Sequence, residues 1–224
     1  MRQSTTEECL RKRMTSDMEG EPQPDGAARD SADHWIGECP LGEMARVRFR
    51  HVRPDDAELI ADAIHTASPE TILHRFFTLI DGVPPRRLRE MLTIDRSREA
   101  CIVGVMRDGD ATRIICGARY VRGSTPGRAE IAVTVHDDVQ HMGLGTFMLR
   151  TIADLARREG LREFEAWVLP SNRPMLRLLR KLFPEQQRRL SGEVYQIIVP
   201  LDGIAGESAP PGDPDGGALP GNAP

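Results

Sequence analysis

The sequence predicts an α/β domain built on one mixed sheet, with helices covering its faces. Strand-like runs and helical apolar periodicities alternate through the middle of the chain in the order β α α β β β α β α β. The three consecutive strands predict an antiparallel meander. The strand–helix–strand unit that follows predicts a right-handed parallel crossover. Both strand directions are therefore expected in the same sheet.

The elements before this crossover follow from local patterns. Residues 47–51 alternate as a strand, and Pro54 with two following acids begins a helix. Ser68-Pro69-Glu70 begins a second helix, and residues 86–92 form a short third one. Strands at 100–106 and 112–121 are joined by an Asp-Gly turn, and a turn at 123–127 leads into the third meander strand at 128–135.

The elements after the meander begin with a helix that ends near Gly160, a residue typical of helix C-termini. A strand at 163–169 follows it. Asn172 and Pro174 then open another helix. Residues 193–199 close the sheet.

Composition divides the 224-residue chain into three parts. Residues 1–44 are polar and interrupted by Pro and Gly, and residues 202–224 are mostly Gly, Pro, Ala and Asp. Neither end can offset the entropy of ordering by burial, so both are expected to be disordered tails. Residues 45–201 are expected to form one domain.

Charge and hydropathy exclude several classes of function. The net charge of −4 gives no basic footprint for nucleic acid. No apolar run approaches the roughly 20 residues that span a bilayer, and the N-terminus lacks the apolar core of a signal peptide, so a cytoplasmic protein is expected. The four cysteines have no CxxC spacing and the histidines no metal-ligand spacing, which predicts free thiols and no metal.

Residues 131–158 form the unit around which the chain is organised. Apolar Ile131, Val133 and Val135 alternate as a strand, and a glycine-bearing turn opens a helix with one apolar face. The N–H groups of such a turn and the helix dipole both favour an anion at the helix N-terminus. The anion predicted here is the pyrophosphate of a coenzyme.

The order of elements, the QxxGxG turn at 140–145 and the Asn that opens the next helix resemble the GNAT superfamily of acyl-CoA-dependent N-acyltransferases. The resemblance covers nearly all of residues 45–201. Five further stretches resemble the bacterial Pat-type protein lysine acetyltransferases: residues 52–56 (VRPDD), 75–77 (RFF), 95 with 98–99, 118–120 (ARY) and 129–133 (AEIAV). Such relatives often carry an attached regulatory or synthetase-like domain, for which the first 44 residues are too few, so a stand-alone form is expected.

The resemblance implies that acetyl-CoA is the co-substrate and that its pantetheine arm lies between two splayed parallel strands, Val133–Val135 and the strand ending near Leu169. Backbone groups of 133–135, chiefly Val133 and Val135, would pair with the arm. Asn172 would bond the pantetheine or cap its own helix. The expected cofactor-binding residues are Val133, Thr134, Val135, Gln140, His141, Met142, Gly143, Leu144, Gly145, Thr146 and Asn172.

The chain also departs from the family pattern. His141 and Met142 stand where the family usually has Gly or Arg followed by Arg, so one charge near the phosphates is lost. Leu179 occupies the position of a Tyr that often protonates the departing thiolate, which leaves water for that step. The usual Gly-Phe at the end of that helix is Phe183-Pro184.

Glu130 is the expected general base. A lysine ammonium has a pKa of about 10.4, so its neutralisation at pH 7 costs about 4–5 kcal/mol, and a nearby carboxylate can take the proton. Glu130 matches the catalytic Glu of the Pat-like branch. The backbone N–H near Val133 would meet the oxyanion. His136, Asp137 and Asp138 are alternative bases, although turn formation and helix-dipole contacts explain them as well.

The other histidines, His51, His65 and His74, are expected to be structural or surface residues. Residues 75–77 and the arginine run at 86–89 lie in the segment that forms a wall of the acceptor site in this superfamily. They could contact an acceptor protein and contribute to its recognition. Core aromatics beside solvated arginines are the plainer interpretation.

The predicted function is acetyl transfer from acetyl-CoA to a lysine ε-amine of a protein, by direct attack in a ternary complex. The resemblance suggests metabolic enzymes such as acyl-CoA synthetases as acceptors. A small-molecule amine is one alternative acceptor. A non-catalytic module that senses acyl-CoA is an alternative of another class.

Overall fold

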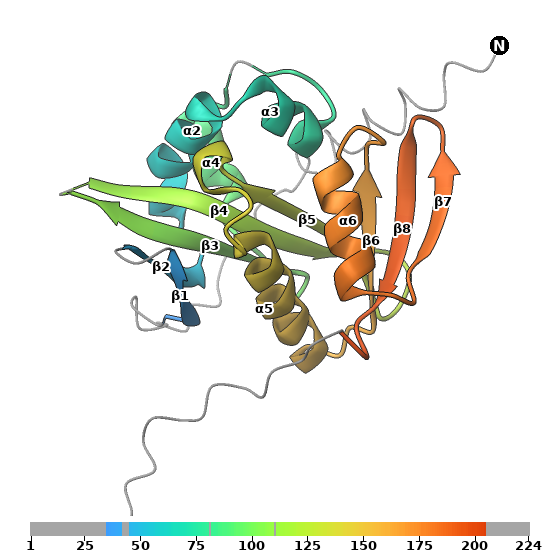
Figure 1. The fold of residues 1–224 in the computed structure, drawn as a ribbon. Helices are drawn as coiled ribbons and strands as arrows, with labels where there is room; N and C mark the ends of the chain where they lie inside the picture. The colour runs from blue at the N-terminus through green and yellow to red at the C-terminus, as the bar shows by residue number, and fades with distance from the viewer. Residues whose placement is uncertain (1–34, 42–44, 81, 110, 205–224) are drawn as a thin grey trace, which may run out of the picture.

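An eight-stranded mixed sheet runs through the described part of the chain, residues 35–41, 45–80, 82–109 and 111–204 of the computed structural model (Figure 1). The strand order is β1-β2-β3-β4-β5-β6-β8-β7, and β5 and β6 are the parallel pair. The mixed sheet, the meander and the crossover are confirmed. The strands are β1 Gly37–Leu41, β2 Ala45–His51, β3 Glu99–Asp108, β4 Ala111–Arg122, β5 Arg128–Val135, β6 Glu163–Val168, β7 Gln187–Ser191 and β8 Val194–Pro200.

Helices cover both faces of this sheet. One face carries η1 (Pro54–Asp56), α2 (Ala57–Thr66), α3 (Pro69–Phe76) and α4 (Pro85–Met91), and the other carries α5 (Leu144–Arg158) and α6 (Arg173–Leu182) (Figure 1). The short helix η2 (Asp137–Val139) joins β5 to α5. A buried ion pair anchors the start of the first helical segment, since the two terminal nitrogens of Arg50 each lie 2.6 Å from a carboxylate oxygen of Asp56.

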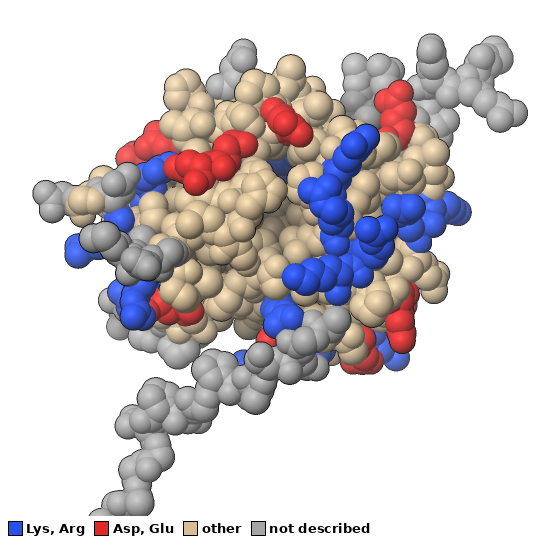
Figure 2. All heavy atoms as spheres, viewed as in Figure 1, with Lys and Arg blue, Asp and Glu red and all other residues tan. Residues whose placement is uncertain are grey.

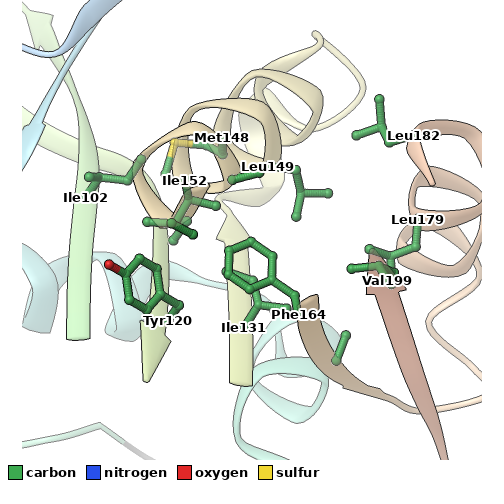
Figure 3. Close-up of a cluster of buried hydrophobic side chains, with 14 of the residues drawn as sticks. Ile102, Tyr120, Ile131, Met148, Leu149, Ile152, Phe164, Leu179, Leu182 and Val199 are labelled. Atoms are coloured by element: carbon green, nitrogen blue, oxygen red, sulfur yellow. The ribbon is translucent and has the colours of Figure 1, made fainter. Parts of the chain in front are cut away.

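The main core lies between the sheet and the α5–α6 layer. Figure 3 shows Met148, Leu149 and Ile152 of α5 above Ile131 and Phe164, with Leu179 and Leu182 reaching in from α6. All of these side chains are at most 6% exposed, so the apolar face predicted for the central helix is buried as expected. A smaller cluster on the opposite face contains Val52, Val103, Val105 and Ile114.

The ordered domain is longer than the predicted 45–201. Gly37–Leu41 pairs with β2 from Gly37↔Phe49 to Leu41↔Ala45, so the expectation of a disordered stretch up to residue 44 is wrong for this segment. Its backbone partners come from β2 and its one buried apolar side chain is Leu41, at 8% exposed, so composition alone could not reveal it. Ile204, in the predicted C-terminal tail, is also buried, at 4% exposed. Residues 1–34 and 205–224 lie outside the described residues.

The meander turns as predicted. Asp108 pairs with Ala111, so β3 and β4 are joined by a two-residue turn in which Gly109 has φ 61°. A β-bulge follows, because the register shifts from Val105↔Ile114 to Gly104↔Cys116. The extra residue, Ile115, shifts the alternation of side chains between the two faces of the sheet. As a result, Cys116, Ala118 and Tyr120 point into the main core.

The parallel pairing of β5 with β6 is short. It comprises Arg128↔Glu163, Ala129↔Phe164 and Glu130↔Glu165, after which the two strands are no longer paired. The five residues that follow Glu130 in β5 keep β4 as a partner on one side. The predicted splay is therefore present, and it begins at Glu130.

Candidate active site

A narrow cavity of about 60 Å³ fills the splay between β5 and β6. Its walls combine the two strands with the end of α3 and the start of α6. The lining side chains and backbone belong to Glu130, Ile131, Ala132 and Val133 of β5, Ala166, Trp167 and Val168 of β6, His74, Arg75 and Phe77, Asn172, Met175 and Leu179, and Leu149 of α5. We refer to this cavity as the β5–β6 gap.

The backbone of β5 is oriented toward this gap at alternate residues. His136 N–H donates to Ile115 O at 2.8 Å, so the even-numbered residues of β5 exchange hydrogen bonds with β4. The N–H and C=O groups of Val133 and Val135 therefore point to the β6 side. Of the three residues expected to contact the pantetheine, Val133 and Val135 have the required orientation. Thr134 instead directs its backbone to β4.

Glu130 lies at the point where the splay begins, and it lines the gap. Its side chain is exposed and belongs to the same face of β5 as Ala132 and Thr134, on the side of α2 and α3. The carboxylate of Glu130 thus borders the gap three residues before Val133.

The loop after β5 presents the N-terminus of α5. His141 and Gly143 both have left-handed backbone conformations, with φ 65° and φ 90°. Gly143 is the N-cap residue and has no side chain to accept a hydrogen bond from the first turn. The first backbone N–H in this turn with an acceptor in the helix is that of Phe147, which donates to Gly143 O at 3.1 Å. The N–H groups of Leu144, Gly145 and Thr146 precede it and therefore have no acceptor within the helix. Binding of a pyrophosphate by these groups stays a prediction.

Gly145 has a packing role as well. A Cβ atom there would lie 3.0 Å from Cδ2 of Leu178, so the glycine allows α6 to approach the start of α5. Gly143 has no atom within 4 Å of such a Cβ, and its positive φ is what favours glycine. The two glycines of the motif therefore serve different purposes.

The side chain of Gln140 binds the protein itself. Its Nε2 atom donates to Val135 O and to Thr71 Oγ1, both at 3.2 Å. This amide thereby fixes the loop to the end of β5 and to α3. Because the side chain is engaged in this way, the predicted contact of Gln140 with the coenzyme would be made by its backbone.

Asp137 closes the N-terminus of α3. Its carboxylate accepts hydrogen bonds from Ser68 N at 2.8 Å, Ser68 Oγ at 2.7 Å and Thr71 Oγ1 at 2.8 Å. Partial burial by itself would raise the pKa of Asp137, but these hydrogen bonds and nearby His136 outweigh it and hold the pKa below its ordinary value. The carboxylate is thus a structural acceptor, and the interpretation as a helix-dipole partner is supported.

His136 and Asp138 are also occupied. The ring nitrogens of His136 lie 3.0 Å from Thr66 Oγ1 and 2.6 Å from an Asp138 carboxylate oxygen. Arg113 donates to the other Asp138 oxygen at 3.0 Å. Partial burial opposes ionisation of Asp138, yet the hydrogen bonds from His136 and Arg113 lower its pKa. These contacts explain His136 and Asp138 without a role as base, and Glu130 stays the predicted base.

Asn172 caps its own helix. Its side-chain oxygen accepts a hydrogen bond from Met175 N at 3.1 Å, which is the second of the two predicted roles. Leu179, at the position of the family's frequent Tyr, is 1% exposed and forms an apolar wall of the gap.

His74 was expected to be structural or superficial, but it lines the gap. Its Nε2 atom lies 3.2 Å from Ser171 Oγ, so α3 and the loop after β6 meet across the gap. No spacing in the sequence indicates this, because the two residues are 97 positions apart.

A second, larger cavity of about 180 Å³ lies between the sheet and the α2–α4 layer. Most of its lining is apolar, including Ile60, Ile64, Ile72, Leu88, Leu92, Ile94, Cys101 and Val103. Burial raises the pKa of the Cys101 thiol to about 11, so that it stays protonated at neutral pH. We refer to this space as the apolar cavity.

The Arg75-Phe76-Phe77 stretch separates the two cavities. Phe76 lines the apolar cavity, Phe77 lines the gap, and Arg75 borders both. The aromatic rings are half-buried, so they belong to the interior walls. The plainer interpretation of this stretch is thus supported for the aromatics.

Cationic side chains stand beside the gap on the outer surface. Figure 2 shows Lys and Arg gathered over α6 and β7, next to a hollow between α3 and α6. The exposed residues of these two elements that carry the charge are Arg173, Arg177, Arg180, Lys181, Arg188 and Arg189.

Within the described residues, no group of three or more His, Cys, Asp or Glu side chains is arranged to hold a metal ion. None of the helices in that part of the chain combines the length and the apolar character needed to cross a bilayer.

Comparison with known proteins agrees with this architecture. The model of the acetyltransferase (GNAT) family matches residues 67–183. The acetyltransferase PA5475 of Pseudomonas aeruginosa is 31% identical over 155 residues, which cover 66% of this chain and 82% of that protein. The acetyltransferase Pat of Mycolicibacterium smegmatis is 34% identical over 136 residues, covering 60% of this chain and 40% of Pat. The chain thus spans less than half the length of that relative.

Solved structures show the same fold. The GNAT domain of S. lividans PAT aligns with a TM-score of 0.61 at 24% identity, over 69% of this chain and 90% of that domain. Salmonella typhimurium yncA, solved with its cofactor acetyl-CoA, aligns with a TM-score of 0.53 at 20% identity, over 73% of this chain and 98% of yncA. The family match, the relatives and the splayed sheet agree: this chain is an acyltransferase that belongs to the GNAT acetyltransferase family and resembles its Pat-like members.

Proposed function

We propose that this enzyme transfers an acetyl group from acetyl-CoA to a lysine ε-amine of a protein. The observation that supports this most is the β5–β6 gap, which begins at Glu130 and is lined by Val133. The rest of β5 and a short loop then lead to the uncapped N-terminus of α5. This arrangement fits an extended amide-bearing arm that ends in a pyrophosphate.

The coenzyme would be held chiefly by backbone groups. Val133 and Val135 would pair with the pantetheine amides in the manner of an added strand. The N–H groups of 144–146 and the helix dipole would bind the pyrophosphate. Residues 141 and 142 supply no arginine here, and the cations over α6 and β7 would attract the acidic coenzyme instead.

Glu130 would act as the general base. It would take a proton from the incoming ammonium, directly or through water, as the amine attacks the thioester carbon. The Val133 N–H would donate to the oxyanion of the tetrahedral intermediate. The departing thiolate would receive its proton from water or from the His74–Ser171 pair, because Leu179 cannot supply one.

The acceptor class rests on the relatives. Pat of M. smegmatis is similar in sequence to this domain, and the GNAT domain of S. lividans PAT has a similar fold. Metabolic enzymes such as acyl-CoA synthetases are the proposed acceptors, in a cytoplasmic setting. A small-molecule amine is the alternative acceptor. Because Glu130 and the gap are both present, we place catalysis ahead of a non-catalytic sensor of acyl-CoA.

The test is mass spectrometry of a cell extract incubated with the full-length protein and isotope-labelled acetyl-CoA. Label on lysines of proteins supports the proposal, and label confined to small metabolites contradicts it.

Glu130→Gln tests the assignment of the base. We expect kcat to fall by at least about 100-fold, while the Kd for acetyl-CoA changes less than about twofold. Glu165→Gln is the matched control, because Glu165 is the register partner of Glu130 and bonds Gln196 instead. Equal turnover in Glu130→Gln and the parent protein would exclude Glu130.

A further inference from the structure

The apolar cavity adjoins the place where the chemistry would occur. Ala132 and Arg75 line both the cavity and the β5–β6 gap. Ala132 lies between Glu130, at the start of the splay, and Val133, whose N–H points into the gap. A thioester held at this point of the gap would therefore have the mouth of the cavity beside its acyl carbon.

The floor of the cavity is open because small residues form it. Gly117 pairs with Thr134, and a Cβ atom built on Gly117 would meet only the backbone oxygen of Ile102, at 3.7 Å. Three alanines also line the cavity: Ala132 on β5, Ala63 on α2, and Ala67, which directly follows α2. Larger residues at these positions would fill the space, so the volume is built into the sequence.

The chemical character of the cavity suits a hydrocarbon. Its walls are mainly Ile, Leu, Val and Phe side chains with a protonated thiol, and several of its polar members are engaged in hydrogen bonds. Arg119, for example, donates to a Glu99 carboxylate oxygen at 2.8 Å. The apolar lining would contact the methylene groups of a hydrocarbon chain and remove them from water. An ammonium group would be penalised there.

We propose that the apolar cavity is an acyl-chain site, so that the enzyme accepts saturated acyl-CoA thioesters longer than acetyl-CoA. This inference rests on the proposed binding of a coenzyme thioester in the gap. Each methylene buried in the cavity should strengthen binding about fourfold. The transfer itself would be unchanged: the amine nitrogen bonds to the acyl carbon, the carbon–sulfur bond breaks, and CoA leaves as the thiol.

Calorimetric titration of the full-length protein with CoA, acetyl-CoA, butyryl-CoA and hexanoyl-CoA tests the proposal. We expect butyryl-CoA to bind roughly 15-fold more tightly than acetyl-CoA, from two additional methylenes. Equal affinities along the series, with CoA itself bound, would overturn the acyl-chain site and leave the proposed acetyl transfer intact. Failure of CoA to bind at all would overturn both. Tighter binding of succinyl-CoA than of butyryl-CoA would also overturn it, because the cavity would then recognise a carboxylate.

Two variants locate the effect. Gly117→Val and Ala63→Leu fill the cavity from opposite walls, and each should abolish the preference for butyryl-CoA while acetyl-CoA binds as in the parent protein. Ala61→Leu, on the same helix but outside the cavity lining, is the control and should retain the preference. If both filling variants keep the full preference, the acyl chain binds elsewhere and the assignment fails. Unchanged acetyl-CoA binding shows that each variant is folded.

Discussion

The loop that joins β5 to α5 contacts two helix N-termini, those of α3 and α5, and only the first of them receives a capping carboxylate from this loop. Asp137 gives its carboxylate to the start of α3, where Ser68 also caps Thr71 N at 3.1 Å. Six residues later, Gly143 begins α5 with no capping side chain. Both helix starts attract negative charge, but only one receives it from the chain. The uncapped start of α5 is the one at which we propose that the pyrophosphate binds.

The largest expected effect comes from removing the internal anion. Asp137→Asn loses the charge that accepts three hydrogen bonds and should lower the free energy of unfolding by about 2 kcal/mol. Urea unfolding would measure it. Asp138→Asn is the control, since an exposed ion pair is worth at most about 1 kcal/mol. Equal losses from the two variants would contradict a special role for Asp137.

The destabilisation caused by Asp137→Asn should become smaller as the pH is lowered. Because the folded-state pKa of Asp137 lies below its ordinary value of 3.8, the carboxylate stabilises the fold above that value. The stabilisation falls as the pH drops through the lowered folded pKa. The difference in the free energy of unfolding between the parent protein and Asp137→Asn should therefore have its full size at pH 7 and decrease below about pH 4.

Gly143→Ala tests the start of α5. A side chain at φ 90° is strained and would displace the N–H groups of the first turn. We expect the Kd for CoA to rise about tenfold, measured by calorimetry. Gly160→Ala imposes similar strain, at φ 76°, beyond the other end of the helix and should cost stability alone. A tenfold rise in Kd for Gly160→Ala as well would mean that the strain acts through the whole helix.

Asn172→Ala extends the comparison to a third helix start. Loss of the cap on Met175 N should cost about 1 kcal/mol in urea unfolding and leave the Kd for CoA within twofold. Asn172→Ser should restore most of the stability, because serine also caps. If serine restores stability while CoA still binds weakly, the amide contacts the coenzyme.

Met142→Arg should produce the smallest change. Met142 is 46% exposed beside the first turn of α5, and an arginine there would bring back a cation usual in the family. An exposed charge of this kind is worth about 0.3–1 kcal/mol, so CoA should bind roughly two- to fivefold more tightly at low salt. The gain should fall as salt is added. Met142→Gln is the neutral control, and equal affinity in the two variants would contradict an electrostatic effect.

The sequence was most informative where structure depends on local patterns. The strand at 131–135, the Gly109 turn and the helix starts at Ser68 and Asn172 all follow from alternation, turn chemistry or capping, and the structure confirms them. The splay was expected from the resemblance to a family, because no local pattern specifies where two strands separate.

Features that depend on distant partners were missed. β1 is a strand because β2 lies beside it, although Gly37 and Pro40 argue against one. Asp137 and Ser68, like His74 and Ser171, meet across many positions of sequence. The apolar cavity depends on the combined volumes of side chains from several elements, which spacing along the chain does not encode.

The brief pairing of β5 with β6 has a consequence for hydrogen exchange. Side-chain packing joins the two sides of the gap, because Ile131, Leu149, Phe164 and Leu179 belong to one core. The backbone ladder, in contrast, stops after Glu130. The amides of Val133 and Val135 should therefore exchange rapidly in the unliganded enzyme and become protected with CoA bound, so that the coenzyme acts as the missing strand of the sheet.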